Sequence, residues 1–214
     1  KLIIDKETFQ LKSMKIVLDL NTHLSFPAIL RDGTDIYIYP ENSASGSSML
    51  YKYNSEDDSV SVIRQLSNQP LTDAIITKID DNFYIFTTEI PTQNGNKLSI
   101  YSALDDMESY KLIQNIILFD NTARSAGDIF VDNGRIVRPA QNCNGGYGVG
   151  LVFQEIIKDS KGDFVLKELF RRKPIKNYIG MHTYNQYKGC YIVDLHARRY
   201  PYLHKCLQFF KNLM

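Results

Sequence analysis

Four segments of the sequence repeat one pattern: a short apolar strand, a polar turn with Gly or Asn, and a second apolar strand. The repeats recur about every 50 residues along the chain. Their core hairpins lie near residues 24–41, 72–89, 124–141 and 181–194. Such regular spacing limits the chain to architectures built from repeated hairpins.

A second pair of candidate strands follows each of the first three hairpins, which gives four strands per repeat. Four strands at this period are typical of the blades of a β-propeller. A helical solenoid would show apolar residues at helical spacing inside each repeat, and the sequence does not. A two-sheet sandwich is the structural rival, but it does not predict repeats this similar. We therefore predict an all-β fold, a β-propeller.

The ends of the chain are expected to be less regular. Residues 1–20 are interpreted as an incomplete first blade, with strands at Thr8–Lys12 and Ile16–Asp19. The tail, Tyr202–Leu213, is the best helix candidate, and residues 1–214 are expected to form a single domain. An incomplete blade leaves an unprotected edge strand near the N-terminus, which makes a homo-oligomer possible.

The third hairpin carries the densest set of polar residues. Its turn is predicted at Asp132–Gly134, where Asn-Gly supplies the positive φ angles of a tight turn. The returning strand is expected to run from Arg135 to Arg138 and to end at Pro139, which has no N–H for a ladder. The polar side chains at the hairpin ends are either a ligand-gripping pocket floor or a structural arginine network.

Composition narrows the function classes. The net charge is +1, so no nucleic acid partner is implied. The three cysteines are widely spaced and form no CxxC or Cys/His pair, so neither a metal site nor a cofactor is expected. No apolar run approaches the roughly 20 residues of a membrane span. No signal peptide is visible, which favours a cytoplasmic location.

In a propeller, the first residues of the innermost strands converge on one mouth of the central channel, where function concentrates. The carboxylates expected there as catalytic groups are Asp73, Glu41 and Glu155. The side chains expected to bind substrate are His23, Arg124, Asp128, Arg138, Gln141 and His182. Each has a structural alternative: a turn cap for Asp73, a solvated group for Glu41, an arginine partner for Glu155, and packing roles for the histidines.

Five segments resemble a glycosidase-like five-bladed propeller domain: His23–Pro27, Tyr39–Glu41, Ala123–Gly127, Arg138–Gln141 and Gly180–Thr183. That domain occurs in the N-terminal part of plant glucosamine inositolphosphorylceramide transferases and in many bacterial proteins of carbohydrate loci. It is distantly similar to arabinanases, xylosidases and invertases. The resemblance, from about Leu18 to Asp194, implies five blades, a carbohydrate ligand and a pocket-facing Asp73. The Ala-Asp-Pro motif usual in the first blade is absent, so one expected carboxylate is missing.

Three functions remain open at this point. A glycoside hydrolase needs one carboxylic acid and one carboxylate at the scissile bond. A non-catalytic sugar-binding module of polysaccharide biosynthesis, associated with a glycosyltransferase, needs only hydrogen-bonding groups and the stacking faces of Tyr37, Tyr39 and Tyr147. A propeller for protein interaction would instead present a large exposed apolar patch.

Overall fold

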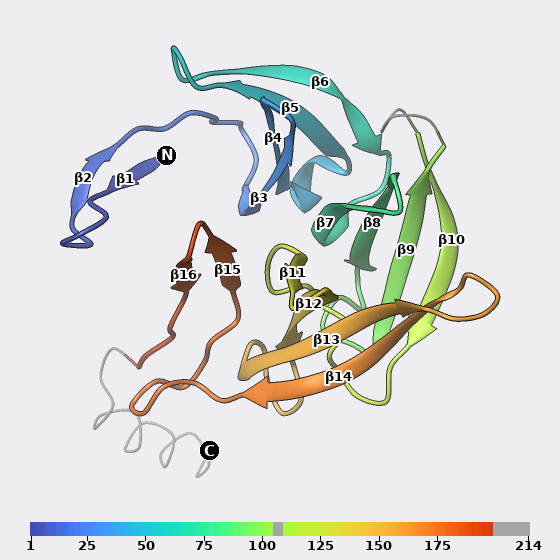
Figure 1. Ribbon diagram of the computed structural model, residues 1–214. Helices are drawn as coiled ribbons and strands as arrows, with labels where there is room; N and C mark the ends of the chain where they lie inside the picture. The colour runs from blue at the N-terminus through green and yellow to red at the C-terminus, as the bar shows by residue number, and fades with distance from the viewer. Residues whose placement is uncertain (105–108, 199–214) are drawn as a thin grey trace, which may run out of the picture.

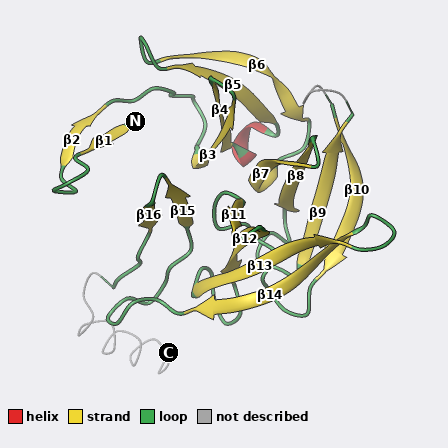
Figure 2. Ribbon diagram, in the orientation of Figure 1, coloured by secondary structure: helices red, strands yellow, loops and turns green. Residues whose placement is uncertain are grey.

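A computed structural model describes residues 1–104 and 109–198 and confirms an all-β fold. The sheets are separate and antiparallel, and three of them have four strands each (Figure 1). Within the described residues, helix is limited to one 3₁₀ turn, η1 (Ser43–Ser45), between β4 and β5 (Figure 2). None of the described helices is long and apolar enough to span a bilayer. The helix expected at Tyr202–Leu213 lies outside the described residues.

Each four-stranded sheet contains its strands in chain order. The first sheet consists of β3 (Ser25–Asp32), β4 (Asp35–Glu41), β5 (Ser48–Asn54) and β6 (Ser59–Ser67). The second consists of β7 (Leu71–Ile79), β8 (Asn82–Glu89), β9 (Lys97–Ala103) and β10 (Tyr110–Ile117). The third consists of β11 (Phe130–Asp132), β12 (Arg135–Asn142), β13 (Gly150–Lys158) and β14 (Phe164–Arg172).

Two further sheets have two strands each. They are β1 (Leu2–Ile4) with β2 (Leu11–Met14), and β15 (Tyr184–Tyr187) with β16 (Cys190–Val193). The sheets are arranged around a centre, with β3, β7, β11 and β15 innermost and β6, β10 and β14 outermost (Figure 1). This arrangement brings the starts of the innermost strands, far apart in sequence, toward one another.

The N-terminal strands differ from those expected. The strand predicted at Thr8–Lys12 begins at Leu11, and no strand forms at Ile16–Asp19. The reason is local: the Asp5 carboxylate accepts backbone N–H bonds from Glu7 and Thr8, which fixes a turn there. The resulting β1–β2 pair exposes apolar side chains, namely Leu2, Ile3, Ile4, Phe9, Leu11 and Met14.

The β11–β12 turn forms as predicted, with Asn133 at φ 50° and Gly134 at φ 77°. The expected end of the returning strand at Pro139 is wrong, because β12 continues to Asn142. The Pro139 carbonyl accepts the Ala126 N–H, so the ring nitrogen faces the same edge, beyond the end of β11. The missing N–H therefore costs no bond to β13.

The main hydrophobic core joins the first three sheets. Phe164 shows how: it begins β14 but packs edge-on against Tyr84 and Phe86 of β8, with ring centroids 4.9 and 5.5 Å away. The Gln114 side chain of β10 also bonds the Phe164 backbone, donating to its carbonyl and accepting its N–H, each at 2.8 Å. One residue therefore fixes the third sheet against the second.

Phe164→Ala is expected to lower the free energy of unfolding by about 3–5 kcal/mol, because a buried ring is lost and a cavity remains. Urea denaturation followed by circular dichroism measures the change. Phe119→Ala is the matched control, since the Phe119 ring is fully exposed. Equal loss in both variants would contradict this packing.

Candidate functional site

A central cavity of about 760 Å³ lies between β3, β7, the segment that precedes β11 and the β15–β16 hairpin. Five of the residues predicted as site residues line it. They are Asp73, Arg124, Asp128, Gln141 and His182. Tyr147, expected to stack on a sugar, lines it as well, whereas Tyr37 and Tyr39 do not.

Asp73 enters the site from a β-bulge near the start of β7. The pairing register with β8 shifts between Thr72 and Ile75, and Asp73 has a φ of 44°, in the left-handed region. The same bulge occurs in β3, where Phe26 has a φ of 43°. A bulge re-aims one side chain out of the strand alternation. The repeat therefore presents a carboxylate at the second sheet and an aromatic ring at the first.

Two side chains of the third sheet region clamp the Asp73 carboxylate. Arg124 Nε donates to Asp73 Oδ2 at 2.6 Å, and Gln141 Nε2 donates to the same oxygen at 2.8 Å. Burial alone would lower the pKa of Arg124, but the Asp73 carboxylate outweighs it and raises that pKa. A charge-assisted pair of this kind fixes the position of the Asp73 carboxyl group at the cavity wall.

Glu41 lies behind Asp73 and is not among the cavity-lining residues. Its Oε2 accepts the Asp73 backbone N–H at 3.0 Å and lies 4.0 Å from Arg124 Nη2. Burial, followed by the neighbouring Asp73 carboxylate, raises the pKa of Glu41 to about 7. One proton is therefore retained by this carboxyl pair to near neutral pH.

Asp128 has a different environment. Its side chain is accessible from the cavity, and within the described part of the chain no cation pairs with it. Desolvation by the surrounding walls raises the pKa of Asp128 to about 6. The cavity thus contains one carboxyl group paired with a guanidinium, Asp73, and one whose pKa is raised, Asp128.

Three predicted site residues lie elsewhere. Glu155 lies in β13, in register with Val137 and Lys167, away from the cavity. His23 is exposed before the start of β3. Arg138 is fully buried beneath the Thr122–Ser125 segment, and burial lowers its pKa to about 9.

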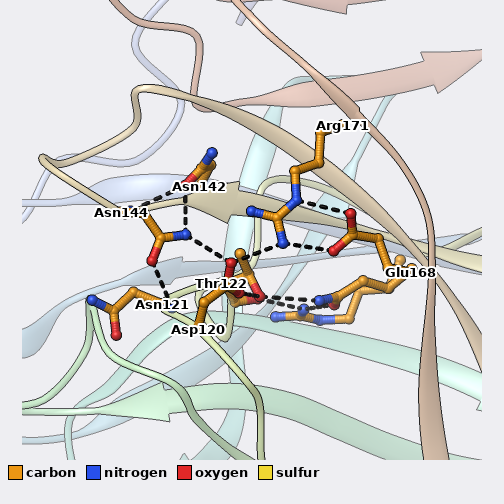
Figure 3. Close-up of polar contacts among 9 residues, drawn as sticks. Asp120, Asn121, Thr122, Asn142, Asn144, Glu168 and Arg171 are labelled. Carbon is orange, nitrogen blue, oxygen red and sulfur yellow. Dashed lines mark hydrogen bonds and ion pairs between the residues drawn. The ribbon is translucent and has the colours of Figure 1, made fainter.

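The Arg138 guanidinium bonds only neutral acceptors in the described structure. It donates through Nη1 to Gln154 Oε1 at 2.7 Å, and through Nη2 to the Ala123 carbonyl and to Ser125 Oγ. The polar contacts continue outward from Gln154: its amide donates to the Thr122 hydroxyl, which donates to Asp120 (Figure 3). The segment that carries Arg124 is therefore fixed from behind.

Figure 3 shows the outer part of this layer. Asp120 accepts a bond from Asn144 at 3.0 Å and pairs with Arg171 at 2.8 Å. Arg171 also makes a two-point contact with Glu168 at 2.8 and 2.6 Å. Together these contacts join β14 to the segment before β11, which carries Asp120, and to the loop after β12, which carries Asn144. The arginine network weighed as a structural alternative is present, and it supports the site.

The last hairpin contributes His182 and a partner that the sequence prediction missed. Asp194 Oδ2 contacts His182 Nδ1, and the rings of His182 and Tyr147 meet at 5.1 Å. Tyr147 in turn lies under the Arg124 guanidinium at 4.9 Å. The signal was available: Glu41 and Glu89 end the second strand of their hairpins, and Asp194 directly follows the second strand of the last hairpin. No group of three or more potential ligands for a metal ion exists among the described residues.

Comparison with known proteins identifies the family. The family model "Glucosamine inositolphosphorylceramide transferase 1, N-terminal" matches residues 4–190. This chain belongs to that family. It is 27% identical over 158 residues to glucosamine inositolphosphorylceramide transferase 1 of Oryza sativa subsp. japonica, and 24% identical over 163 residues to that of Arabidopsis thaliana. These matches cover 70% and 73% of the chain but only 21% and 20% of the relatives' length.

The fold is shared with glycosidases. An exo-β-1,3-galactanase from Phanerochaete chrysosporium matches 82% of this chain with a TM-score of 0.60 and 11% identity, over 44% of its own length. An exo-1,5-α-L-arabinanase from a bovine ruminal metagenomic library matches 77% of the chain with a TM-score of 0.55 and 12% identity, over 66% of its length. Both likenesses establish a glycosidase-like β-propeller fold and nothing more. The curated relatives above are plant proteins.

Glu41→Gln is expected to change how stability depends on pH. A carboxyl whose pKa is raised on folding stabilises the native state at low pH, and that contribution is lost as pH rises through about 7. The variant should therefore gain stability relative to the parent between pH 5 and pH 8. Melting temperatures at the two pH values test this.

Glu89→Gln is the matched control, because Glu89 ends the equivalent strand of the second sheet. Burial alone would raise the pKa of Glu89, but bonds from Ser99 and Tyr101 outweigh it and lower that pKa. This variant should show no gain over the same interval. An identical profile for both variants would refute the assigned Glu41–Asp73 coupling.

Arg138→Lys is expected to destabilise the fold, because a single ammonium cannot reach acceptors on both sides of the guanidinium. Buried acceptors left unpaired cost about 1–3 kcal/mol each. Urea denaturation should show a loss of about 2 kcal/mol or more, whereas the exposed Arg135→Lys should show almost none. An unchanged unfolding free energy in Arg138→Lys would contradict the structural role.

Proposed function

We propose that this chain is a carbohydrate-recognition domain that binds a sugar in the central cavity. The observation that carries the proposal is the Asp73 carboxylate, clamped by Arg124 and Gln141 at the cavity wall. A carboxyl group held rigidly next to an arginine and an amide offers acceptors and donors at fixed positions, which suits vicinal hydroxyls. Tyr147 adds an aromatic face on the same wall.

The relatives support a sugar as the ligand class. The family is named for a transferase of glucosamine, and the solved structures with the same fold include complexes with galactose and with xylose. The chain spans about a fifth of the length of the curated relatives, so the transfer reaction itself need not reside in it. We infer an accessory role in glycan or glycolipid assembly, with the sugar held by this domain.

A second candidate function, glycoside hydrolysis, rests on Asp128. Hydrolysis requires a protonated carboxyl and an ionised carboxylate facing one sugar. The raised pKa of Asp128 and the arginine-paired Asp73 would supply these two roles. Against it stands Phe26, which occupies the bulge equivalent to Asp73 in the first sheet and leaves that sheet without a cavity carboxylate.

We also propose that the sheets are blades of one five-bladed propeller domain formed by residues 1–214. The three four-stranded sheets would be complete blades, with β15–β16 as the inner part of a fourth and β1–β2 as the outer part of another. The shared fold of the galactanase and the arabinanase supports this assignment. A crystal structure with the two small sheets paired into a single blade would overturn it.

Asp73→Asn tests sugar recognition by this cavity. Galactose, xylose and glucosamine serve as probes, and calorimetry measures their binding. Loss of the charged partner should weaken the best probe by about tenfold or more, because hydrogen bonds to charged groups contribute about 1.5–3 kcal/mol. Asp81→Asn is the control, since the Asp81 side chain is almost fully exposed.

The nitrophenyl glycosides of galactose and xylose separate the two functions by testing catalysis in the parent and in Asp128→Asn. A recognition domain gives no turnover with the parent or with Asp128→Asn. A hydrolase gives turnover that Asp128→Asn lowers by about 10²-fold or more. Binding of none of the probes, even at millimolar concentration, would reject sugar recognition by this cavity.

A further inference from the structure

His182 and Asp194 form a second polar unit on the cavity wall, separate from the Asp73 clamp. The imidazole lines the cavity, and its Nδ1 contacts Asp194 Oδ2. Within residues 1–104 and 109–198, no protein group bonds to the other ring nitrogen, Nε2. One nitrogen of the ring is therefore committed to the protein, and the other is available to a ligand.

Asp194 is held as a fixed carboxylate. Its Oδ1 accepts the backbone N–H of His182 at 2.9 Å, the backbone N–H of Thr183 at 2.6 Å and the Thr183 hydroxyl at 3.0 Å. Burial alone would raise the pKa of Asp194, but these donors outweigh it and lower that pKa. An ionised carboxylate at Nδ1 requires that nitrogen to carry the proton, which fixes the tautomer of a neutral imidazole.

The orientation of the ring is fixed as well. The edge of the ring meets Tyr147 at an interplanar angle of 69°. On another side, Gly148 approaches so closely that an added Cβ would lie 2.6 Å from the Cβ of His182. Gly148 also has a φ of 60°, which favours glycine. The ring is thus held by a carboxylate, an aromatic edge and a backbone that only glycine permits.

We propose that His182 Nε2 is a hydrogen-bond acceptor for one hydroxyl of the bound sugar, and that Asp194 is the positioning residue that keeps it an acceptor. The inference rests on the proposed function, because the ligand is the sugar in the same cavity. It adds a specificity element: a hydroxyl is required opposite Nε2, because a cavity acceptor left without its donor is costly. The contacts of Asp73 with Arg124 and Gln141 do not impose this requirement.

Asp194→Asn is the decisive variant, because it replaces one carboxylate oxygen of Asp194 with an amide nitrogen. The amide oxygen can keep the three bonds from His182 and Thr183, while the amide nitrogen now faces Nδ1 as a donor. The imidazole should then move its proton to Nε2 and become a donor toward the cavity. Nitrogen-15 NMR of the histidine side chains at pH 8 should show this change of tautomer directly.

Binding of galactose and of its monodeoxy analogues provides the second measurement. Asp194→Asn should weaken galactose by about three- to tenfold, the range of one neutral hydrogen bond. In the parent, the analogue that lacks the hydroxyl opposite Nε2 should bind more weakly than galactose by a similar factor. With that analogue, Asp194→Asn should cause no further loss of affinity. His196→Gln is the control, because His196 lies in the same segment but outside the cavity lining.

Two results would overturn the inference. The first is a parent His182 that carries its proton on Nε2 at pH 8. The second is a tautomer change in Asp194→Asn that leaves the galactose affinity unaltered, with the variant affecting galactose and every deoxy analogue equally. Failure of the parent to bind galactose, xylose or glucosamine would reject the proposed function instead, and the tautomer would still be measured.

Discussion

The contact between Arg124 and Asp73 is the interaction on which the rest of the site depends. It joins the segment before β11 to the bulge of β7, across the boundary between two sheets. The pair is largely buried, so removal of either partner would leave an uncompensated charge at a cost of about 3–5 kcal/mol. Glu41, Gln141, Asn94 and Tyr147 are all arranged around this one pair.

Two layers of polar contacts support the pair. Arg138 and the Asp120–Arg171 layer fix the backbone that carries Arg124, and Glu41 fixes the backbone N–H of Asp73. A preorganised site of this kind loses little conformational entropy when a ligand binds.

The sequence predicts the fold through its repeats, because each hairpin shows strand, turn and strand clearly. It also predicts that Asp73, Arg124, Asp128, Gln141 and His182 meet, since the starts of inner strands converge in any propeller. The sequence does not reveal which face of a strand each side chain occupies. Arg138 and Gln141 lie three positions apart in β12, so their side chains point to opposite faces of the strand, because a strand alternates its faces. Of the two, only Gln141 lines the cavity.

The β-bulges at Phe26 and Asp73 are also invisible in the sequence, since neither position is glycine and both have positive φ. Glu155 illustrates the remaining limit: it was expected among the catalytic carboxylates, but its register places it in β13, between β12 and β14 and away from the cavity. Pro139 was misplaced because the missing N–H matters only toward a neighbouring strand, and β11 is too short to reach it.

A crystal structure of the protein soaked with galactose, xylose or glucosamine tests the central claim most directly. The account predicts a sugar ring in the central cavity, with hydroxyl groups within hydrogen-bond distance of Asp73, Arg124 or Gln141. A sugar bound only at another surface, with the central cavity occupied by water at saturating concentration, would contradict it.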